Sequence, residues 1–287
     1  MRLNMETRWL YTTSENFTSL REISKDTCVI PMGCIEKHGL HLPLGTDILQ
    51  ANHIAFKASQ IEPVCIFPDF TFGDISENSP TRPNGSISLP VETIMLLLEQ
   101  LCEQIARNGF KKIMIYNGHG GNISWLKTFL RKLDQKPHDF VVVVFNIRCG
   151  IMERIAKSKT FKGLNDDDIK LAMDCLENRP EDGHGGYSET SFMLATAPES
   201  VKMDRLGIIS GKSRNLTKKY KSVGITIRDG GWEIDYPNWL ECDEPIGCNE
   251  RIGEVAVKLE SERLAKAIKF LKDDQDLIKW NQEKHIL

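Results

Sequence analysis

The chain of 287 residues has no excess of charge of one sign, no long apolar run and no closely paired cysteines. Its 37 basic residues against 40 acidic ones give a formal net charge of −3, so no basic surplus is available to neutralise a phosphate backbone. No apolar stretch approaches the roughly 20 residues of a membrane span, and the N-terminus lacks the basic and then apolar order of a signal peptide. We therefore expect a cytoplasmic protein that binds neither nucleic acid nor a membrane.

The eight cysteines are scattered along the chain, and none of them forms a CxxC pair. This spacing argues against a zinc ribbon and against a thioredoxin-type motif. Several cysteines lie in apolar runs, for example around Cys28 and Cys65. The pattern is typical of reduced cysteines in a cytosolic protein.

Segments with strand character alternate with segments of helical periodicity. Continuous apolar runs predict strands over 27–33, 64–70, 111–117 and 140–147. Repeats of three and four positions predict helices over 48–60, 91–108, 122–135, 188–197 and 253–271. The polar stretch 148–182 is interpreted as a helical insertion or a loop. A parallel sheet that is covered on both faces requires continuous apolar strands, so we expect an α/β fold. Without a repeat or linker we expect one domain over residues 1–287.

The loop after the first predicted strand carries several groups that bind metals. In an open α/β sheet, ligands gather beyond the carboxyl ends of the strands, and this loop contributes Glu36, His38, His41 and Asp47. If the backbone stays extended, Glu36 and His38 point to the same side, and Asp47 returns at the start of the next helix. Such a set suits zinc, manganese or iron. The alternative is a solvated loop in which Asp47 caps the helix.

Two further loops are rich in glycine and histidine. The loop NGHGGN, residues 117–122, presents His119 between a strand and a helix. A phosphate-binding turn or a purely structural bend is the alternative there, although neither GxxxxGKS/T nor GxGxxG is matched. The loop DGHGGYSETS, residues 182–191, carries His184 and Glu189 at a helix start. Histidines at three like positions of the topology favour a metal-dependent hydrolase.

These motifs resemble those of a known family. The run PMGCIEKHGLHLPLGTD resembles the signature of the creatininase (creatinine amidohydrolase) family, and NGHGGN, HGGYSETS and the loop GDISENSPTRPNGSISLP resemble three further blocks. The resemblance implies a three-layer α/β/α fold with a mostly parallel sheet and two divalent metal ions per chain, with zinc preferred over manganese or iron. It implies hydrolysis of a non-peptide C–N bond in a small-molecule amide, cyclic amide or formamide. It also implies a homo-oligomer, commonly a hexamer.

The resemblance also implies roles for single residues. Glu36 and His119 would hold one metal, His38 the other, and Asp47 would bridge the two. Gly121 stands where creatininase itself has a carboxylate, which counts against creatinine as the substrate. His184 would donate a proton to the leaving nitrogen, and Glu189 is an additional ligand or a group that supports one. The residues expected to bind substrate are Gly120, Gly185, Gly186, Tyr187 and Asn78.

Two alternative functions and the role of one aromatic cluster stay open at this point. A deformylase or a peptide-trimming enzyme would use the same site on another substrate. A catalytically silent small-molecule binding protein is a different class, against which the intact set of four metal ligands argues. The aromatic cluster of Trp232, Tyr236 and Trp239 lines a substrate entrance, forms a subunit contact or packs a loop.

Overall fold

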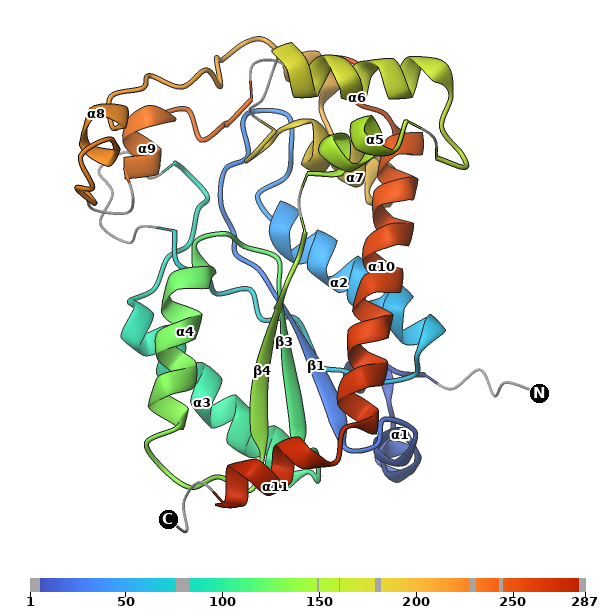
Figure 1. Ribbon diagram of the computed structural model, residues 1–287. Helices are drawn as coiled ribbons and strands as arrows, with labels where there is room; N and C mark the ends of the chain where they lie inside the picture. The colour runs from blue at the N-terminus through green and yellow to red at the C-terminus, as the bar shows by residue number, and fades with distance from the viewer. Residues whose placement is uncertain are drawn as a thin grey trace.

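The computed structural model describes residues 6–75, 83–148, 150–159, 161–178, 182–227, 231–242 and 245–283. Its centre is a four-stranded parallel sheet with the strand order β2-β1-β3-β4 (Figure 1). The strands are β1 (Thr27–Met32), β2 (Cys65–Ile66), β3 (Lys112–Asn117) and β4 (Val141–Asn146). In the register of the sheet, Ile30 pairs with Ile115, which pairs with Val144. The predicted parallel sheet is confirmed.

Helices surround this sheet. They are α1 (Phe17–Ile23), α2 (Thr46–Ile61), α3 (Val91–Arg107), α4 (Asn122–Leu133), α5 (Ile151–Ser158), α6 (Asp166–Asn178), α7 (Tyr187–Thr196), α8 (Lys218–Lys221), α9 (Trp232–Asp235), α10 (Glu250–Asp273) and α11 (Asp276–Glu283), with short 3-10 turns at Trp9–Tyr11, Pro198–Ser200 and Met203–Arg205. None of the helices within the described ranges has both the length and the apolar composition needed to cross a membrane.

Two apolar cores lie on the two faces of the sheet. Successive side chains of a strand point to opposite faces, so Cys28 and Ile30 join the core under α1, α3 and α4, while Val29 joins the core under α2, α7 and α10. Figure 1 shows α3 and α4 on one side of the strands and α2 and α10 on the other. This arrangement confirms the three-layer α/β/α fold.

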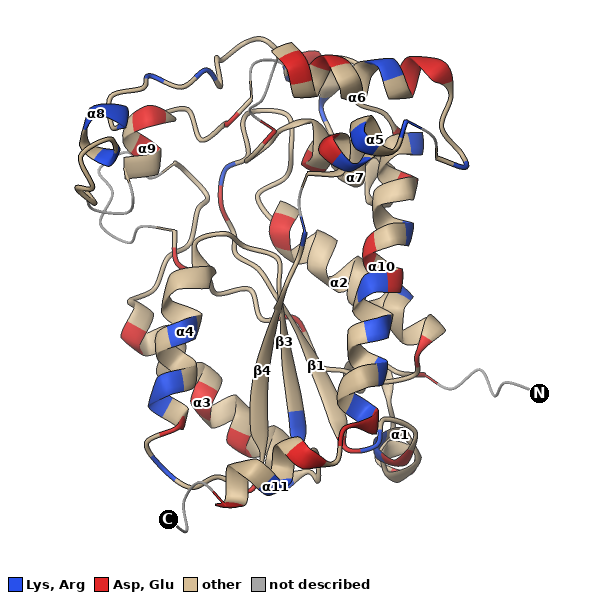
Figure 2. Ribbon diagram, viewed as in Figure 1, with Lys and Arg blue, Asp and Glu red and all other residues tan. Residues whose placement is uncertain are grey.

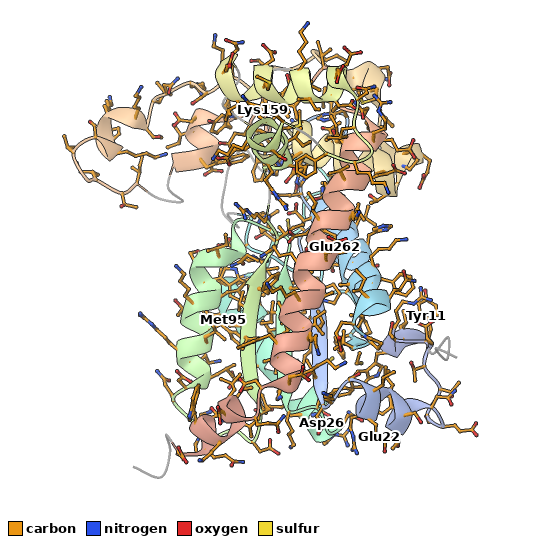
Figure 3. The ribbon with its side chains drawn as sticks, turned by 45° about the vertical axis from the view of Figure 1, so that its right-hand side comes forward. Tyr11, Glu22, Asp26, Met95, Lys159 and Glu262 are labelled. Carbon is orange, nitrogen blue, oxygen red and sulfur yellow. The ribbon has the colours of Figure 1, made fainter. Side chains whose placement is uncertain are left out.

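The long helix α10 covers one face of the sheet along its length. Its inward stripe includes Leu264 and Ile268, which are fully buried, while Glu262 on its outer side is exposed (Figure 3). Basic and acidic residues are mixed along its outer face (Figure 2), as the nearly balanced charge of the chain predicts. The side chain of Asn249 accepts a hydrogen bond from the Ile252 amide and caps the helix, so α10 begins three residues before the predicted 253–271.

Two strands differ from their predicted form. The strand predicted over 64–70 is reduced to β2, because Pro68 offers no N–H for a ladder; Phe70 returns to the sheet only through an isolated bridge to Met32. Strand β4 lies at an edge, so Val142 to Phe145 are half-buried rather than covered on both faces.

The polar stretch 148–182 contains the helices α5 and α6. Of the two interpretations of this stretch, the helical insertion is therefore the correct one.

Candidate metal centre

The carboxyl ends of β1 and β3 and the start of α7 bring the three histidine loops together. A close approach at Gly33 makes this possible, since a Cβ there would lie 2.5 Å from the backbone nitrogen of Ile48. The chain after β1 can therefore pass directly over the first turn of α2, which carries Asp47. Six side chains meet at this point, all of them largely buried: Glu36, His38, Asp47, His119, His184 and Glu189.

Asp47 lies between two imidazoles. Its Oδ1 is 3.1 Å from Nε2 of His38, and its Oδ2 is 2.8 Å from Nδ1 of His119. The side chain of Asp47 is only 4% exposed. Each carboxylate oxygen thus serves a different histidine, which is the arrangement expected of a carboxylate shared by two metal ions.

The three histidines His38, His119 and His184 are anchored in the same way. In each ring, one nitrogen donates to a backbone carbonyl oxygen, which can only accept. The carbonyl groups belong to residue 36 (3.3 Å from His38 Nδ1), residue 74 (2.8 Å from His119 Nε2) and residue 37 (2.6 Å from His184 Nε2). In each ring the other nitrogen faces the carboxylates. Histidines that bind metals are typically held in this way, because the carbonyl fixes the ring and its tautomer.

Glu36 provides a test of whether the residues fit a metal. Its Oε1 is buried and has no well-directed hydrogen bond from any described residue, although Nδ1 of His119 lies 3.0 Å away. Nδ1 of His184 and Nε2 of His38 are also near, at 3.8 and 4.0 Å. A buried carboxylate oxygen without a hydrogen bond, surrounded by three ring nitrogens, is suited to a divalent cation.

Potential ligand atoms fall into three overlapping groups. In each group the atoms lie within 4.8 Å of one another. The groups are Cys34, Glu36, Asp47 and His119; Glu36, His38 and His184; and His38, Asp47 and Glu189. Imidazole nitrogen and carboxylate oxygen together suit zinc, manganese and iron. The donor set therefore fits the two-metal site that the resemblance implies.

Burial and neighbouring charges shift the pKa values in the cluster. Burial raises the pKa of Asp47, but His38 and His119 outweigh this effect and hold it well below its usual value. Burial lowers the pKa of His38, but Asp47 and Glu189 outweigh this effect and raise it to about 10. For His184, burial and the adjacent His38 lower the pKa to about 4. At neutral pH and without a metal, His38 is therefore charged and His184 is neutral.

Glu189 supplies a carboxylate that the second loop lacks. A Cβ at Gly121 would lie 2.3 Å from the carbonyl oxygen of Asp74 and 2.6 Å from Nε2 of His119, so no side chain fits there. Glu189 reaches the cluster from α7 instead, with Oε2 3.6 Å from Nε2 of His38. The amide of Gly185 donates to the same oxygen at 2.7 Å.

Cys34 was not among the predicted site residues. Its thiol is fully buried and donates to Oδ2 of Asp47, with Sγ 3.1 Å from that oxygen. The sequence signal for this contact is the position of Cys34 directly after Gly33, at the end of β1. Apolar neighbours in the sequence describe Cys28 and Cys65 but not Cys34.

The residues predicted to bind substrate do not lie together. Gly120 lines the cavity described below, and no atom lies within 4 Å of a Cβ placed on it. Gly185 and Gly186 form the turn before α7 but do not line the cavity. Tyr187 is fully buried in the core beneath α10, away from the cavity. Asn78 lies outside the described residues.

His41 points away from the carboxylates. Its Nε2 lies 2.8 Å from Oγ1 of Thr190, on α7. The Thr190 hydroxyl in turn is within 3.2 Å of the carbonyl oxygen of Gly185. This contact ties the first histidine loop to the third.

A cavity of about 790 Å³ opens over the cluster. Its lining includes Glu36, Asp47, His119, His184 and Glu189 on one side and Trp232, Glu233, Trp239 and Glu241 from the segment around α9. A volume of this size accommodates a small-molecule ligand. The indoles of Trp232 and Trp239 line the cavity, whereas Tyr236 packs behind Trp232, with ring centroids 5.5 Å apart.

The chain is similar in sequence and in fold to known enzymes. A creatinine amidohydrolase of Pseudomonas putida is 25% identical over 195 residues, which cover 64% of this chain and 70% of that protein. A mycofactocin precursor peptide peptidase of Mycobacterium ulcerans (strain Agy99) is 26% identical over 187 residues, or 62% of this chain and 61% of the peptidase. A solved Mn creatininase shares the fold, with a TM-score of 0.71, 18% identity, and coverage of 94% of this chain and 100% of that one.

The family model for creatininase, described as creatinine amidohydrolase, matches residues 11–240. The match includes all six side chains of the metal centre. The chain therefore belongs to the creatininase family and is a hydrolase of carbon–nitrogen bonds.

Proposed function

We propose that this protein is a two-metal amidohydrolase that cleaves a non-peptide C–N bond in a small amide or formamide. The observation that carries the proposal is how His38, His119 and His184 are held. Each ring is anchored to a backbone carbonyl through one nitrogen and faces carboxylates with the other. Such anchoring is what holds metal-binding imidazoles in place. The position of the cluster under a cavity of about 790 Å³ gives a substrate access to it.

We assign the ligands from the groups of neighbouring atoms. Glu36 and His119 would hold one ion, and His38 and Glu189 the other. Asp47 would bridge them, with one oxygen toward each histidine. We prefer zinc, with manganese or iron as alternatives, because this nitrogen and oxygen donor set serves all three. When bound, the ions would activate a water and polarise the amide carbonyl.

His184 is positioned to move the proton. Its Nε2–H is held by the carbonyl of Lys37 at 2.6 Å, so the ring has a fixed direction and Nδ1 faces Glu36. A neutral Nδ1 accepts a proton from the attacking water and returns it to the departing nitrogen. The backbone amide of Gly120, at the lip of the same cavity, is a donor available to the developing oxyanion.

Hydrolysis of a panel of amides and formamides tests this function. The protein is stripped with a chelator and reloaded separately with zinc, manganese or iron. We expect turnover only in the reloaded protein, and its loss in Asp47→Ala. Turnover that survives complete metal removal would contradict the proposal.

A peptide-trimming activity is the second candidate. The similarity to the mycofactocin precursor peptide peptidase favours it, at nearly the same identity as the creatinine amidohydrolase. Short peptides are therefore included in the same panel. Release of a terminal residue by the metal-loaded protein, with no cleavage of the small amides, would select this candidate.

A further inference from the structure

Cys34 is a donor group that the proposed ligand set leaves unused. That set gives one ion the side chains of Glu36 and His119, with Asp47 as the bridge. The thiol of Cys34 belongs to the same group of four potential ligand atoms, all within 4.8 Å of one another. The other two groups contain only histidine and carboxylate side chains. Among the described residues, sulfur is therefore available to one of the two ions and not to the other.

Three distances describe the group around Cys34. Its Sγ is 3.1 Å from Oδ2 of Asp47, and that oxygen is 2.8 Å from Nδ1 of His119. The same Nδ1 is 3.0 Å from Oε1 of Glu36. Ligand atoms of a tetrahedral zinc ion, with bonds of about 2.0–2.3 Å, lie roughly 3.3–3.8 Å apart. The four donors are slightly closer together than this, so a small outward shift of the side chains accommodates the ion.

The packing around Cys34 directs its thiol toward the metal centre. On the side away from that centre, Cys34 packs with Ile75 and Trp239 in a small apolar cluster. A Cβ at Gly73 would lie only 2.7 Å from Cβ of Cys34, so the backbone of Gly73 lies directly against this side chain. Cys34 is fully buried. The thiol is therefore held beside the carboxylates rather than turned to solvent.

Glu36 gives a second and independent indication of an ion at this position. Its side chain is 3% exposed, and its Oε1 is buried without a well-directed hydrogen bond from any residue that the structure describes. Buried polar groups are normally paired. A cation held jointly by Glu36 and Cys34 supplies the missing partner of this oxygen.

Sulfur at this position affects which metal is bound. A thiolate is a soft ligand that favours zinc, whereas manganese is better served by carboxylate, carbonyl and water oxygens. A thiol that coordinates a divalent ion loses its proton. The position that includes Cys34 is therefore chemically different from the one formed by His38 and Glu189.

We propose that Cys34 binds, as a thiolate, the ion held by Glu36, Asp47 and His119, and that it makes this position selective for zinc over manganese. The thiol proton passes to solvent as the bond between sulfur and metal forms. The inference rests on the proposed function, because it adds a ligand to the metal centre which that function uses.

The cobalt spectrum of the full chain tests this bond directly. The metal-stripped protein is reloaded with cobalt(II), and bound cobalt is measured together with the absorption spectrum. A bond between thiolate and cobalt gives an intense charge-transfer band in the near ultraviolet, whereas nitrogen and oxygen ligands give only weak bands in the visible. We expect the near-ultraviolet band in the wild type. Bound cobalt without this band would overturn the proposal.

Two serine variants locate the sulfur. Cys34→Ser keeps a hydrogen-bond donor beside Asp47 but removes the sulfur, so we expect it to bind cobalt without the band. Cys102→Ser is the matched control, since Cys102 is a buried cysteine on α3 in the core away from the metal centre, and it should keep the band. A band that persists in Cys34→Ser would assign the sulfur to another cysteine and reject the proposal.

Metal competition tests the selectivity. Wild type and Cys34→Ser are dialysed against a mixture of zinc and excess manganese, and the bound metals are measured by elemental mass spectrometry. We expect the ratio of zinc to manganese to fall roughly tenfold or more in the variant. A thiol that only donates a hydrogen bond to Asp47 is replaced in this role by serine. An unchanged ratio would therefore contradict the selectivity assigned to Cys34.

The outcome also separates this proposal from the function on which it rests. The sulfur band in a protein that hydrolyses no amide would retain Cys34 as a ligand and reject the hydrolase. Hydrolysis by a metal-loaded protein whose cobalt form lacks the band would retain the hydrolase and reject Cys34 as a ligand.

Discussion

The imidazole rings of His38 and His184 lie face to face, with centroids 3.8 Å apart and planes 18° apart. One ring faces Asp47 and Glu189, while the other is bonded through Nε2 to the carbonyl of Lys37. Two stacked imidazoles repel each other if both are protonated, so this contact keeps His184 neutral beside a positively charged or metal-bound His38. The stack thus separates His38, a proposed metal ligand, from His184, the proposed proton carrier.

His184→Ala is expected to keep its metals and lose turnover. Removing a group that transfers protons lowers kcat by roughly 10²–10⁴-fold, while the proposed ligands remain. The measurement is kcat together with metal content, and His53→Ala, a half-buried histidine on α2 outside the cluster, is the control. Unchanged turnover, or loss of metal in proportion to activity, would remove the assigned role.

Glu189→Ala should reduce the metal content from about two ions per chain to about one. Its carboxylate is the only one that α7 brings to His38, and the second loop cannot replace it, because Gly121 has no room for a side chain. Elemental mass spectrometry gives the stoichiometry. Two retained ions would show that Glu189 supports the site without binding metal.

Gly120 and Gly121 offer a matched pair of substitutions. A Cβ at Gly121 would lie 2.3 Å from the carbonyl oxygen of Asp74 and would displace the ring of His119, whereas no atom lies within 4 Å of a Cβ at Gly120. We expect Gly121→Ala to lose its metal and Gly120→Ala to retain it. Thermal unfolding and metal content are measured for both variants. Equal behaviour of the two would contradict the packing of the second loop.

Asp168 links α6 to α10 at a distance from the metal centre. Its buried carboxylate accepts from the side chains of Asn249 and Arg251. Burial raises the pKa of Asp168, but hydrogen bonds from Arg251, Asn165 and Asn249 outweigh this effect and leave it below its usual value. The carboxylate therefore stabilises the fold above its unfolded pKa of about 4, and this contribution is lost as the pH falls through its lower folded pKa.

Asp168→Asn should therefore cost about 1–3 kcal/mol at neutral pH, and the difference from wild type should shrink at acidic pH. Denaturant unfolding between pH 7 and pH 3 measures it. Asp204→Asn removes only an exposed pair with Arg205 and serves as the control. A cost that grows as the pH falls would contradict the sign of this linkage.

Much of the fold was predictable, because β1, β3 and β4 are continuous apolar runs whose ends agree with the structure to within one residue. The strand around Cys65 was predicted too long, since hydrophobicity alone does not register the hydrogen bond that Pro68 removes. The stretch 148–182 stayed open because α6 begins with three aspartates, which stabilise a helix start but reduce its apolar periodicity.

The site was predictable at the level of loops but less so at the level of side chains. Glu36, His38, Asp47 and His119 meet as expected, because parallel strands deliver their carboxyl ends to one edge. The sequence could not show that Tyr187 turns into the core while Glu189, two residues along α7, turns toward His38. The role of Cys34 depends on a contact with Asp47 across 13 positions, which no local pattern encodes.

The most direct test of the two-metal centre is the metal content per chain of wild type and Asp47→Ala, both purified without chelator and measured by elemental mass spectrometry. The proposed bridging role of Asp47 predicts about two ions in the wild type and a loss of most of this metal in the variant. A wild type that binds no zinc, manganese or iron even after reconstitution, or an Asp47→Ala protein that keeps both ions, would contradict it.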